Sequence, residues 1–298
     1  MGLRPHPPEL KEFAERVGTQ GPVGVAGSRT HFELGGALRE GTPLVTAPVG
    51  VVAHDPAEMT VRVRAGTPVS VLEEHLRAGG QMVPLDPECP TSTVGGVLAV
   101  GRSGIRRLGY GHLRDLVLEI TYVNSAGRLI RAGGPTVKNV SGFDLCRLLV
   151  GSLGTLGFIA EVVLRCHPLP EVSRWYVSGE DPEDLLAGLY RPAAILWDGA
   201  VSSVLLEGLA ADVDDQERRF DLSPAESAPE IPRRGRQSVR ASQVADLQGE
   251  FLAEVGVGVV HRSVYTDPPP TDAPALHRAV KKRMDPSGRL NPGREVVV

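Results

Sequence analysis

The chain has 298 residues, 41% of them hydrophobic, and a net charge of −4. This length suits one large domain or two modest ones, and the charge gives no reason to expect nucleic acid or an anionic membrane as a partner. Three cysteines without a C-x-x-C pair speak against a disulfide framework and an iron–sulfur site. Because the chain has neither a signal-peptide pattern nor an apolar run of about 18 residues, we expect a cytoplasmic protein without a membrane-spanning helix.

Short helices and strands are predicted throughout the first 168 residues. The hydrophobic periodicity predicts a helix over 9–17, strands over 22–26, 44–47 and 59–63, a helix over 67–78, a hairpin over 116–130, a helix over 143–150 and a strand over 157–166. The helix over 67–78 has proline just inside its start and a glycine pair just after its end, which is the usual asymmetry of helix boundaries.

The pattern weakens after residue 168. Strands are expected at 174–177, 201–206 and 257–264, with an exposed loop at 223–240 and a final helix at 273–284. The arginine run inside that loop has acidic residues just upstream and no interleaved aromatics, so we interpret it as solvated loop rather than a nucleic-acid site. We therefore predict three regions: a main domain over 1–168, a smaller domain over 169–270, and a helix and tail over 271–298 that packs back on the first.

The stretch 84–104 carries the strongest local signal. Thr91, Ser92 and Thr93 stand directly before the glycine pair Gly95-Gly96. Glycine has no Cβ, so this arrangement allows backbone N–H groups to come close to a diphosphate. Neither G-x-G-x-x-G before a helix nor Gly-Lys-Ser/Thr occurs, so a dinucleotide held by another fold is expected.

Two further segments support a phosphate-containing ligand. The loop that begins at Gly27 follows a predicted strand and can form an anion-binding nest, although an ordinary strand-to-helix turn explains it as well. Gly151, Gly154 and Gly157 recur at spacing three, which helix propensity does not favour. They indicate a close-packed loop against a planar ring or backbone, with a glycine-rich turn as the alternative.

The chain offers little support for other chemistries. Its eight histidines form no H-x-H or H-x-x-x-H pair, so we expect no metal site. His31 and His112 lie in loops near the proposed ligand, where we interpret them as structural or solvent-facing. Hydrolase chemistry has no support, because no G-x-S-x-G occurs. No general base can be named, since that requires reach to the substrate hydroxyl.

Taken together, these motifs resemble the FAD-binding domain of the vanillyl-alcohol oxidase (PCMH-type) flavoprotein superfamily, and within it the small flavin-binding subunits of glycolate oxidases. The matching stretches are VAGSRTHFELGG, the run from Pro84 to Ala99, GRSGIRRLGYGHLRDLVL, VKNVSGFDLCRLLVGSLGTLGFIAEVVLR and the tail DPSGRLNPGR. The resemblance implies an α+β fold: an FAD domain of two subdomains with the cofactor between them, and a short, reduced cap domain.

The resemblance also implies roles for individual residues. The first pyrophosphate loop would be formed by Gly27, Ser28, Arg29 and Thr30. The diphosphate and the flavin would be held by Pro84, Thr91, Gly95, Gly96, Ser103 and Gly104. The same face would be lined by Arg107, Gly109, Gly111 and Arg114, and the adenosine end closed by Gly154, Gly157 and Ile159. The tail over 290–293 would fold back on the FAD domain.

The expected activity follows from the same resemblance. It implies the FAD-binding subunit of a 2-hydroxy-acid oxidoreductase, joined in a hetero-oligomer by a larger flavin subunit and an iron–sulfur subunit, and membrane-associated only through those partners. The first loop has no convincing histidine or cysteine for covalent attachment, so FAD is expected to be non-covalent. The segment H-x-G-D-G-N-x-H of related glycolate and D-lactate enzymes is absent. The alternatives are a free-standing FAD-dependent dehydrogenase and a non-catalytic structural subunit.

Overall fold

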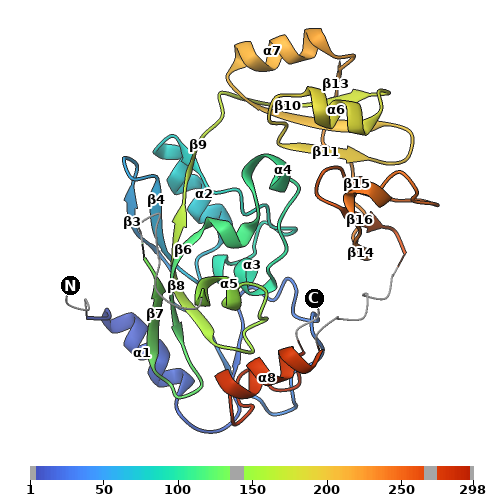
Figure 1. Cartoon of the computed structure of the whole chain (residues 1–298). Helices are drawn as coiled ribbons and strands as arrows, with labels where there is room; N and C mark the ends of the chain where they lie inside the picture. The colour runs from blue at the N-terminus through green and yellow to red at the C-terminus, as the bar shows by residue number, and fades with distance from the viewer. Residues whose placement is uncertain (1–4, 135–143, 265–273, 296–298) are drawn as a thin grey trace. The chain divides into compact units, whose positions relative to one another are not determined.

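The computed structural model describes residues 5–134, 144–264 and 274–295 (Figure 1). The chain divides into two compact units. The first, unit 1, comprises Met1–Gly104, His112–Pro168 and Thr271–Val298, and the second, unit 2, comprises Ile105–Gly111 and Leu169–Pro270. The mixture of helices with antiparallel sheets confirms the predicted α+β class.

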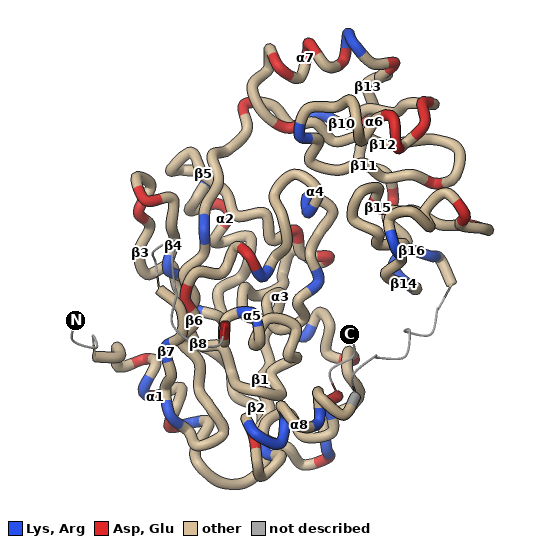
Figure 2. The backbone as a smooth tube through the Cα atoms, viewed as in Figure 1, with Lys and Arg blue, Asp and Glu red and all other residues tan. Residues whose placement is uncertain are grey.

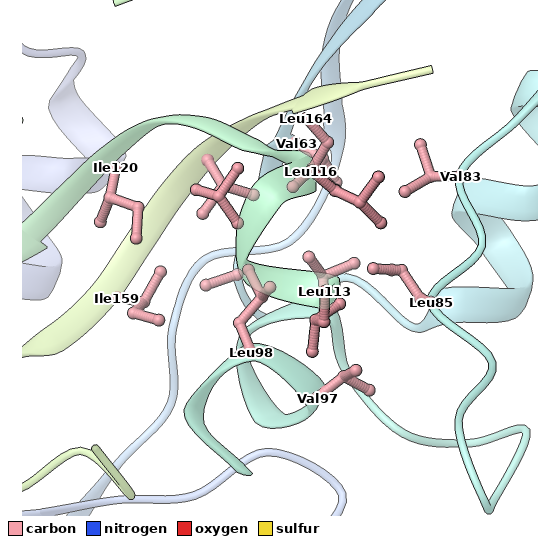
Figure 3. Packing of buried hydrophobic residues seen from close by; sticks show 14 of the residues in the cluster. Val63, Val83, Leu85, Val97, Leu98, Leu113, Leu116, Ile120, Ile159 and Leu164 are labelled. Carbon is pink, nitrogen blue, oxygen red and sulfur yellow. The ribbon is translucent and has the colours of Figure 1, made fainter. Parts of the chain in front are cut away.

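Unit 1 is organised around a five-stranded antiparallel sheet. Its strand order is β3-β4-β8-β6-β7, and the strands are β3 (Val51–Asp55), β4 (Thr60–Arg64), β6 (Val117–Val123), β7 (Leu129–Gly133) and β8 (Phe158–Arg165). Helices α2 (Val69–Ala78) and α3 (Val94–Val100) contribute to the main core with the strands. Figure 3 shows part of this core, where Leu98 of α3 lies among residues such as Ile120 and Ile159.

Helix α1 (Pro8–Val17) forms a second core with the sheet and the C-terminal tail. Its apolar residues recur at helical spacing, and Leu10 and Phe13 are fully buried. They share a cluster with Phe158, Ala160 and the tail residue Leu290. The tail is therefore part of the core of unit 1.

A buried ionic network also crosses this sheet. Arg62 donates to Glu119 and to Glu161, both at 2.7 Å, and Arg64 pairs with Glu161 and, at 2.5 Å, with Glu9 of α1. Removing a buried member such as Glu161 leaves a buried charge uncompensated, which costs about 3–5 kcal/mol. The network therefore ties three central strands and α1 into one arrangement.

The remaining elements of unit 1 are short. Strand β1 (Gly24–Val25) pairs in parallel with β2 (Leu44–Val45), and Val23 forms a parallel bridge with Leu290 after helix α8 (Pro274–Met284). Strand β5 (Gln81–Met82) pairs with β9 (His167–Pro168). The 3₁₀ helix η1 (Leu113–Leu116) and helix α5 (Leu145–Leu149) complete the unit. Helix α5 occupies most of the helix predicted at 143–150, whose first residue lies outside the described residues.

Unit 2 contains a seven-stranded antiparallel sheet. Its order is β13-β10-β12-β11-β15-β16-β14, formed by β10 (Val172–Ser178), β11 (Ala194–Trp197), β12 (Ser202–Gly208), β13 (Ser223–Pro224), β14 (Gly235–Ser238), β15 (Leu252–Glu254) and β16 (Val259–Arg262). Helices α6 (Pro182–Gly188) and α7 (Ala210–Arg219) contribute residues to its core. Acidic and basic residues are mixed along α7 (Figure 2). A further 3₁₀ turn, η2, spans Ala241–Gln243.

The segment Ile105–Gly111, with helix α4 (Arg107–Tyr110), is anchored on the sheet of unit 2 through Glu207. The buried Glu207 carboxylate accepts from Arg106 at 3.0–3.1 Å, from Tyr110 Oη at 2.9 Å and from Ser173 Oγ at 2.7 Å. These partners of the carboxylate all belong to unit 2.

Several elements differ from the sequence prediction. Strands β3, β5 and β11 were not predicted, since β3 is largely exposed, β5 has only two residues, and β11 is an apolar run of four residues between turns. The segment 223–240, predicted as one exposed loop, contains β13 and β14 at the two edges of the sheet. Edge strands with polar side chains lack the alternating apolar pattern on which the prediction relied.

Candidate functional site

A pocket of about 300 Å³ lies within unit 1. Its wall comes from segments that are distant in the chain: residues 25–32, residues 46–49, residues 65–66, helix α3 with its cap, residues 152–159, and the tail residues Asn291 and Arg294. This volume is at the lower end of the range for small-molecule sites. Of the residues predicted to bind the cofactor, those that line the pocket are Gly27, Ser28, Arg29, Thr30, Gly95, Gly96, Gly154, Gly157 and Ile159.

The loop after β1, which lines the pocket, has backbone donors without acceptors among the described residues. Among the described residues, no acceptor is bonded to the amides from Gly27 to Thr30. Arg29 has a φ of 60°, in the left-handed region, as expected for a backbone nest that binds anions. The side chains fasten this loop: Thr30 Oγ1 lies 2.9 Å from Ser92 Oγ, and His31 Nε2 lies 3.1 Å from Glu88 Oε2. The loop is thus held in place while its amides stay available.

The glycine pair in the first turn of α3 has both of its amides bonded within the protein. The Gly96 amide donates to Thr93 Oγ1 at 3.2 Å, and the Gly95 amide donates to Ala65 O at 2.7 Å, so neither is free for a ligand. A Cβ on Gly95 would lie 2.7 Å from Ala65 Cβ, and a Cβ on Gly27 would lie 2.4 Å from Thr93 Oγ1. These glycines allow the segments that form the pocket wall to approach one another.

The glycine-rich turn before β8 forms another part of the wall. Leu153 and Gly154 have φ values of 50° and 69°. A Cβ on Gly154 would lie 2.6 Å from Asn291 Nδ2, and one on Gly157 would lie 2.5 Å from the Tyr122 ring. The close-packed loop predicted here is therefore found, although it packs against protein groups.

The C-terminal tail closes the wall through Asn291, which the sequence analysis did not identify as a site residue. Its Oδ1 accepts from the Val25 amide at 3.0 Å, and its Nδ2 donates to Leu153 O at 2.7 Å. The side chain thereby joins two wall segments, and Asn291 is only 1% exposed. Its φ of 43° is one that asparagine tolerates better than most residues.

Several predicted site residues lie outside this pocket. In unit 1, Thr91 is exposed with its hydroxyl 3.1 Å from Cys89 Sγ, and Ser103 Oγ accepts from the Leu113 amide at 3.0 Å. The others are Pro84, Gly104 and Arg114 in unit 1 and Arg107, Gly109 and Gly111 in unit 2. Thr93, the cap of α3, lines the pocket where Thr91 was predicted. The stretch 137–142 lies outside the described residues.

The basic side chains that line the pocket are Arg29, His31 and Arg294, and no carboxylate is among the lining residues that the structure describes. Burial lowers the pKa of Arg294, while the charge of Glu33 acts in the opposite direction. A pocket with free amides and guanidinium groups suits an anionic ligand. Within the described part of the chain, no group of three potential metal ligands occurs, and no helix is both long and apolar enough to cross a membrane.

Comparison with protein families gives two matches. Residues 9–133 match a family described as "FAD binding domain", and residues 225–294 match one described as "FAD linked oxidases, C-terminal domain". The second match covers the last part of unit 2, residues 225–270, and the tail that lines the pocket in unit 1.

Among curated relatives, the glycolate oxidase subunit GlcE of Escherichia coli (strain K12) is 36% identical over 166 residues, 55% of this chain and 47% of that protein. The D-lactate dehydrogenase of Archaeoglobus fulgidus is 37% identical over 149 residues, 49% of this chain and 33% of that protein. The chain thus spans less than half the length of these relatives. A solved structure of an alkyldihydroxyacetonephosphate synthase superposes with a TM-score of 0.71 at 16% identity, covering 97% of this chain and 76% of the other, which shows a shared fold.

Proposed function

We propose a function on the premise that this chain belongs to the FAD-binding flavoproteins of the vanillyl-alcohol oxidase (PCMH) superfamily, with FAD as its cofactor. The proposal is that the chain is the FAD-binding subunit of an oxidoreductase acting on 2-hydroxy acids of the glycolate and D-lactate kind. Its support comes from relatives that carry the names glycolate oxidase subunit and D-lactate dehydrogenase.

The observation that carries the proposal is the loop from Gly27 to Thr30. Its amides have no acceptor among the described residues, and it lines a pocket whose basic side chains are Arg29, Arg294 and His31. The residues present therefore fit the diphosphate of FAD. The lining contains no cysteine, and its one histidine, His31, is hydrogen-bonded to Glu88, which supports non-covalent binding.

The protein's own contribution is to hold and orient the cofactor. Bound FAD supplies the acceptor for the hydride that leaves the substrate α-carbon, at flavin N5. The Gly27 loop binds phosphate oxygens, and Asn291 keeps this loop's strand against the turn at Leu153. The predicted contacts outside the pocket, such as Ser103 and Arg114, remain proposed contacts to other parts of FAD.

We further propose that the chain works in a hetero-oligomer, with a larger flavin subunit and an iron–sulfur subunit that takes up the electrons. Its similarity to proteins named as glycolate oxidase subunits supports this, as does the absence of the H-x-G-D-G-N-x-H segment. Residues 1–168 with the tail 271–298 would form the FAD domain, and residues 169–270 a reduced cap or partner domain. The alternative is a free-standing dehydrogenase.

The first test is an absorbance spectrum of the purified chain, followed by anaerobic addition of glycolate or D-lactate. A flavin spectrum, as isolated or after reconstitution with FAD, is expected, and it should persist until the partner subunits are added. Bleaching of the flavin by the chain alone would favour the free-standing dehydrogenase. Failure to take up FAD at all would overturn the proposal.

A matched pair of glycine variants tests where FAD binds. Gly154 and Gly80 share a φ of 69°, but a Cβ on Gly154 would collide with Asn291, whereas one on Gly80 has open space. We expect Gly154→Ala to weaken FAD binding by about tenfold or more, which is about 1.4 kcal/mol, and Gly80→Ala to leave the affinity near wild type. Equal FAD affinity in both variants would place the cofactor elsewhere.

A further inference from the structure

Arg294 reaches the pocket because the tail that carries it is firmly anchored in unit 1. The Leu290 backbone bridges to Val23, and Asp285 accepts from both the Leu290 amide at 2.8 Å and Lys281 Nζ at 2.6 Å. Three residues after Leu290, Gly293 has a φ of 94°, and a Cβ there would lie 2.6 Å from Ala37 O. The chain therefore turns at a position that only glycine fills easily, directly before Arg294.

The guanidinium of Arg294 is fixed by one residue of the pocket wall. Its central carbon lies 4.4 Å from the centroid of the Phe32 ring, and its Nη2 donates to Phe32 O at 2.6 Å. The Arg29 guanidinium lies over the same ring at 5.4 Å. Because both groups are so near one centroid, the two positive charges are at most about 10 Å apart. Phe32 thus holds two arginines from opposite ends of the chain beside one pocket.

These contacts leave Arg294 with unused donors. Its Nε is buried and has no hydrogen-bond partner among the described groups. Neither Arg29 nor Arg294 forms an ion pair with a described carboxylate; Glu33 affects Arg294 only through its charge, and Glu88 is engaged with His31 and Arg102. A partly buried guanidinium without an anion is costly, and its planar donors match the oxygens of a phosphate.

We propose that Arg294, with Arg29, donates to the diphosphate of the bound dinucleotide, so that the C-terminal tail supplies a phosphate-binding residue to the site. This inference rests on the proposed function, since it takes FAD as the ligand of this pocket. It assigns Arg294 a role that neither the sequence motifs nor the family matches gave it. The unpaired Nε and the carboxylate-free pocket lining are the observations that carry it.

The test compares ligands that differ only in phosphate. FAD binding to the full chain is measured by flavin fluorescence, and ADP and adenosine are then used to displace it. We expect Arg294→Gln to weaken both FAD and ADP by roughly 10- to 150-fold and to leave adenosine unchanged, since hydrogen bonds to charged groups carry that range of effect. The FAD affinity of this variant should also depend less on salt concentration.

Arg77→Gln is the matched control, because Arg77 is an exposed arginine of α2 in the same unit and does not line the pocket. It removes the same charge and should bind all three ligands as the wild type does. Arg294→Lys keeps the positive charge but lacks the planar guanidinium. It should bind ADP more weakly than the wild type, by a smaller factor than Arg294→Gln, and bind adenosine unchanged. If Arg294→Gln does not fold, the inference is tested with Arg294→Lys instead.

An equal loss of ADP and adenosine would overturn the inference, because Arg294 would then shape the pocket or contact the adenosine. Unchanged FAD affinity in Arg294→Gln would overturn it as well. Failure of the wild-type chain to bind FAD would instead contradict the proposed function, so the two failures are distinguishable.

Discussion

A Cβ at Gly27 should destabilise unit 1 only while Thr93 is present. The new atom would lie 2.4 Å from Thr93 Oγ1 and 3.0 Å from Thr93 Cγ2. Thr93 is buried and caps α3, so it cannot turn away without losing the Gly96 hydrogen bond. Overpacking of this kind costs about 1–3 kcal/mol. We therefore expect Gly27→Ala to lower the free energy of unfolding by about 2 kcal/mol.

Thr93→Ala removes both colliding atoms and leaves its own Cβ at 3.3 Å, a close contact that a shift of a few tenths of an ångström relieves. By itself, Thr93→Ala should lower the free energy of unfolding by about 1 kcal/mol, because the helix cap is lost. In that background Gly27→Ala should be neutral or stabilise by about 0.4–1 kcal/mol, since alanine restricts the unfolded chain and the φ of Gly27 lies outside the left-handed region. The double-mutant cycle should therefore give a coupling energy of about 2–3 kcal/mol.

Urea unfolding followed by far-UV circular dichroism measures this coupling. Trp175 and Trp197 both belong to unit 2, so tryptophan fluorescence serves as an internal control that the unit 1 substitutions should not move. Purely additive effects would refute the packing argument. If stability were additive and FAD binding fell equally in both backgrounds, Gly27 would be needed to make room for the ligand, as the sequence motif first suggested.

Two further predictions concern the cysteines and the tail. Burial raises the pKa of Cys146 to about 11 and that of Cys166 to about 12. Iodoacetamide at pH 8.5 should therefore label Cys89 first in the native protein, as read by mass spectrometry. Rapid labelling of Cys166 in the native protein would contradict its burial. Folding keeps both thiols protonated, so the free energy of unfolding should also fall as the pH rises from their ordinary value of about 9 toward 11. Asn291→Asp should lower the free energy of unfolding by about 1–3 kcal/mol and weaken FAD binding, because a carboxylate cannot donate a hydrogen bond to Leu153 O. If calorimetry finds wild-type stability, Asn291 does not hold the two wall segments together.

The sequence alone was sufficient to predict the fold class and to identify three stretches of the pocket wall. The loop at Gly27, the glycine pair at Gly95 and the turn at Gly154 were each visible as local patterns, and all three line one pocket. A resemblance between motifs can show which stretches belong to a site. It does not show which atoms in them are free, and the amides of Gly95 and Gly96 proved to be engaged within the protein.

The residues that the sequence analysis missed are those whose role depends on distant partners. Asn291 binds the Val25 amide across 266 positions, and Arg294 binds Phe32 across 262 positions. Nothing near either residue in the chain indicates such a partner. Thr93 was passed over in favour of Thr91 for a related reason, since neighbouring hydroxyls in one motif look equivalent until the helix boundary at Val94 makes one of them the cap.

The glycines of the pocket wall are needed for contacts within the protein. A glycine in a phosphate-binding motif is usually explained by the ligand, because a side chain would keep the backbone from it. At Gly27, Gly95 and Gly154 the nearest obstacle to a Cβ is another residue of the wall, at 2.4–2.7 Å. The wall segments must be in close contact before the pocket exists, so these glycines are required even without a ligand. We propose that the loop amides at Ser28 and Arg29 and the arginine of the tail are the groups that select an anion.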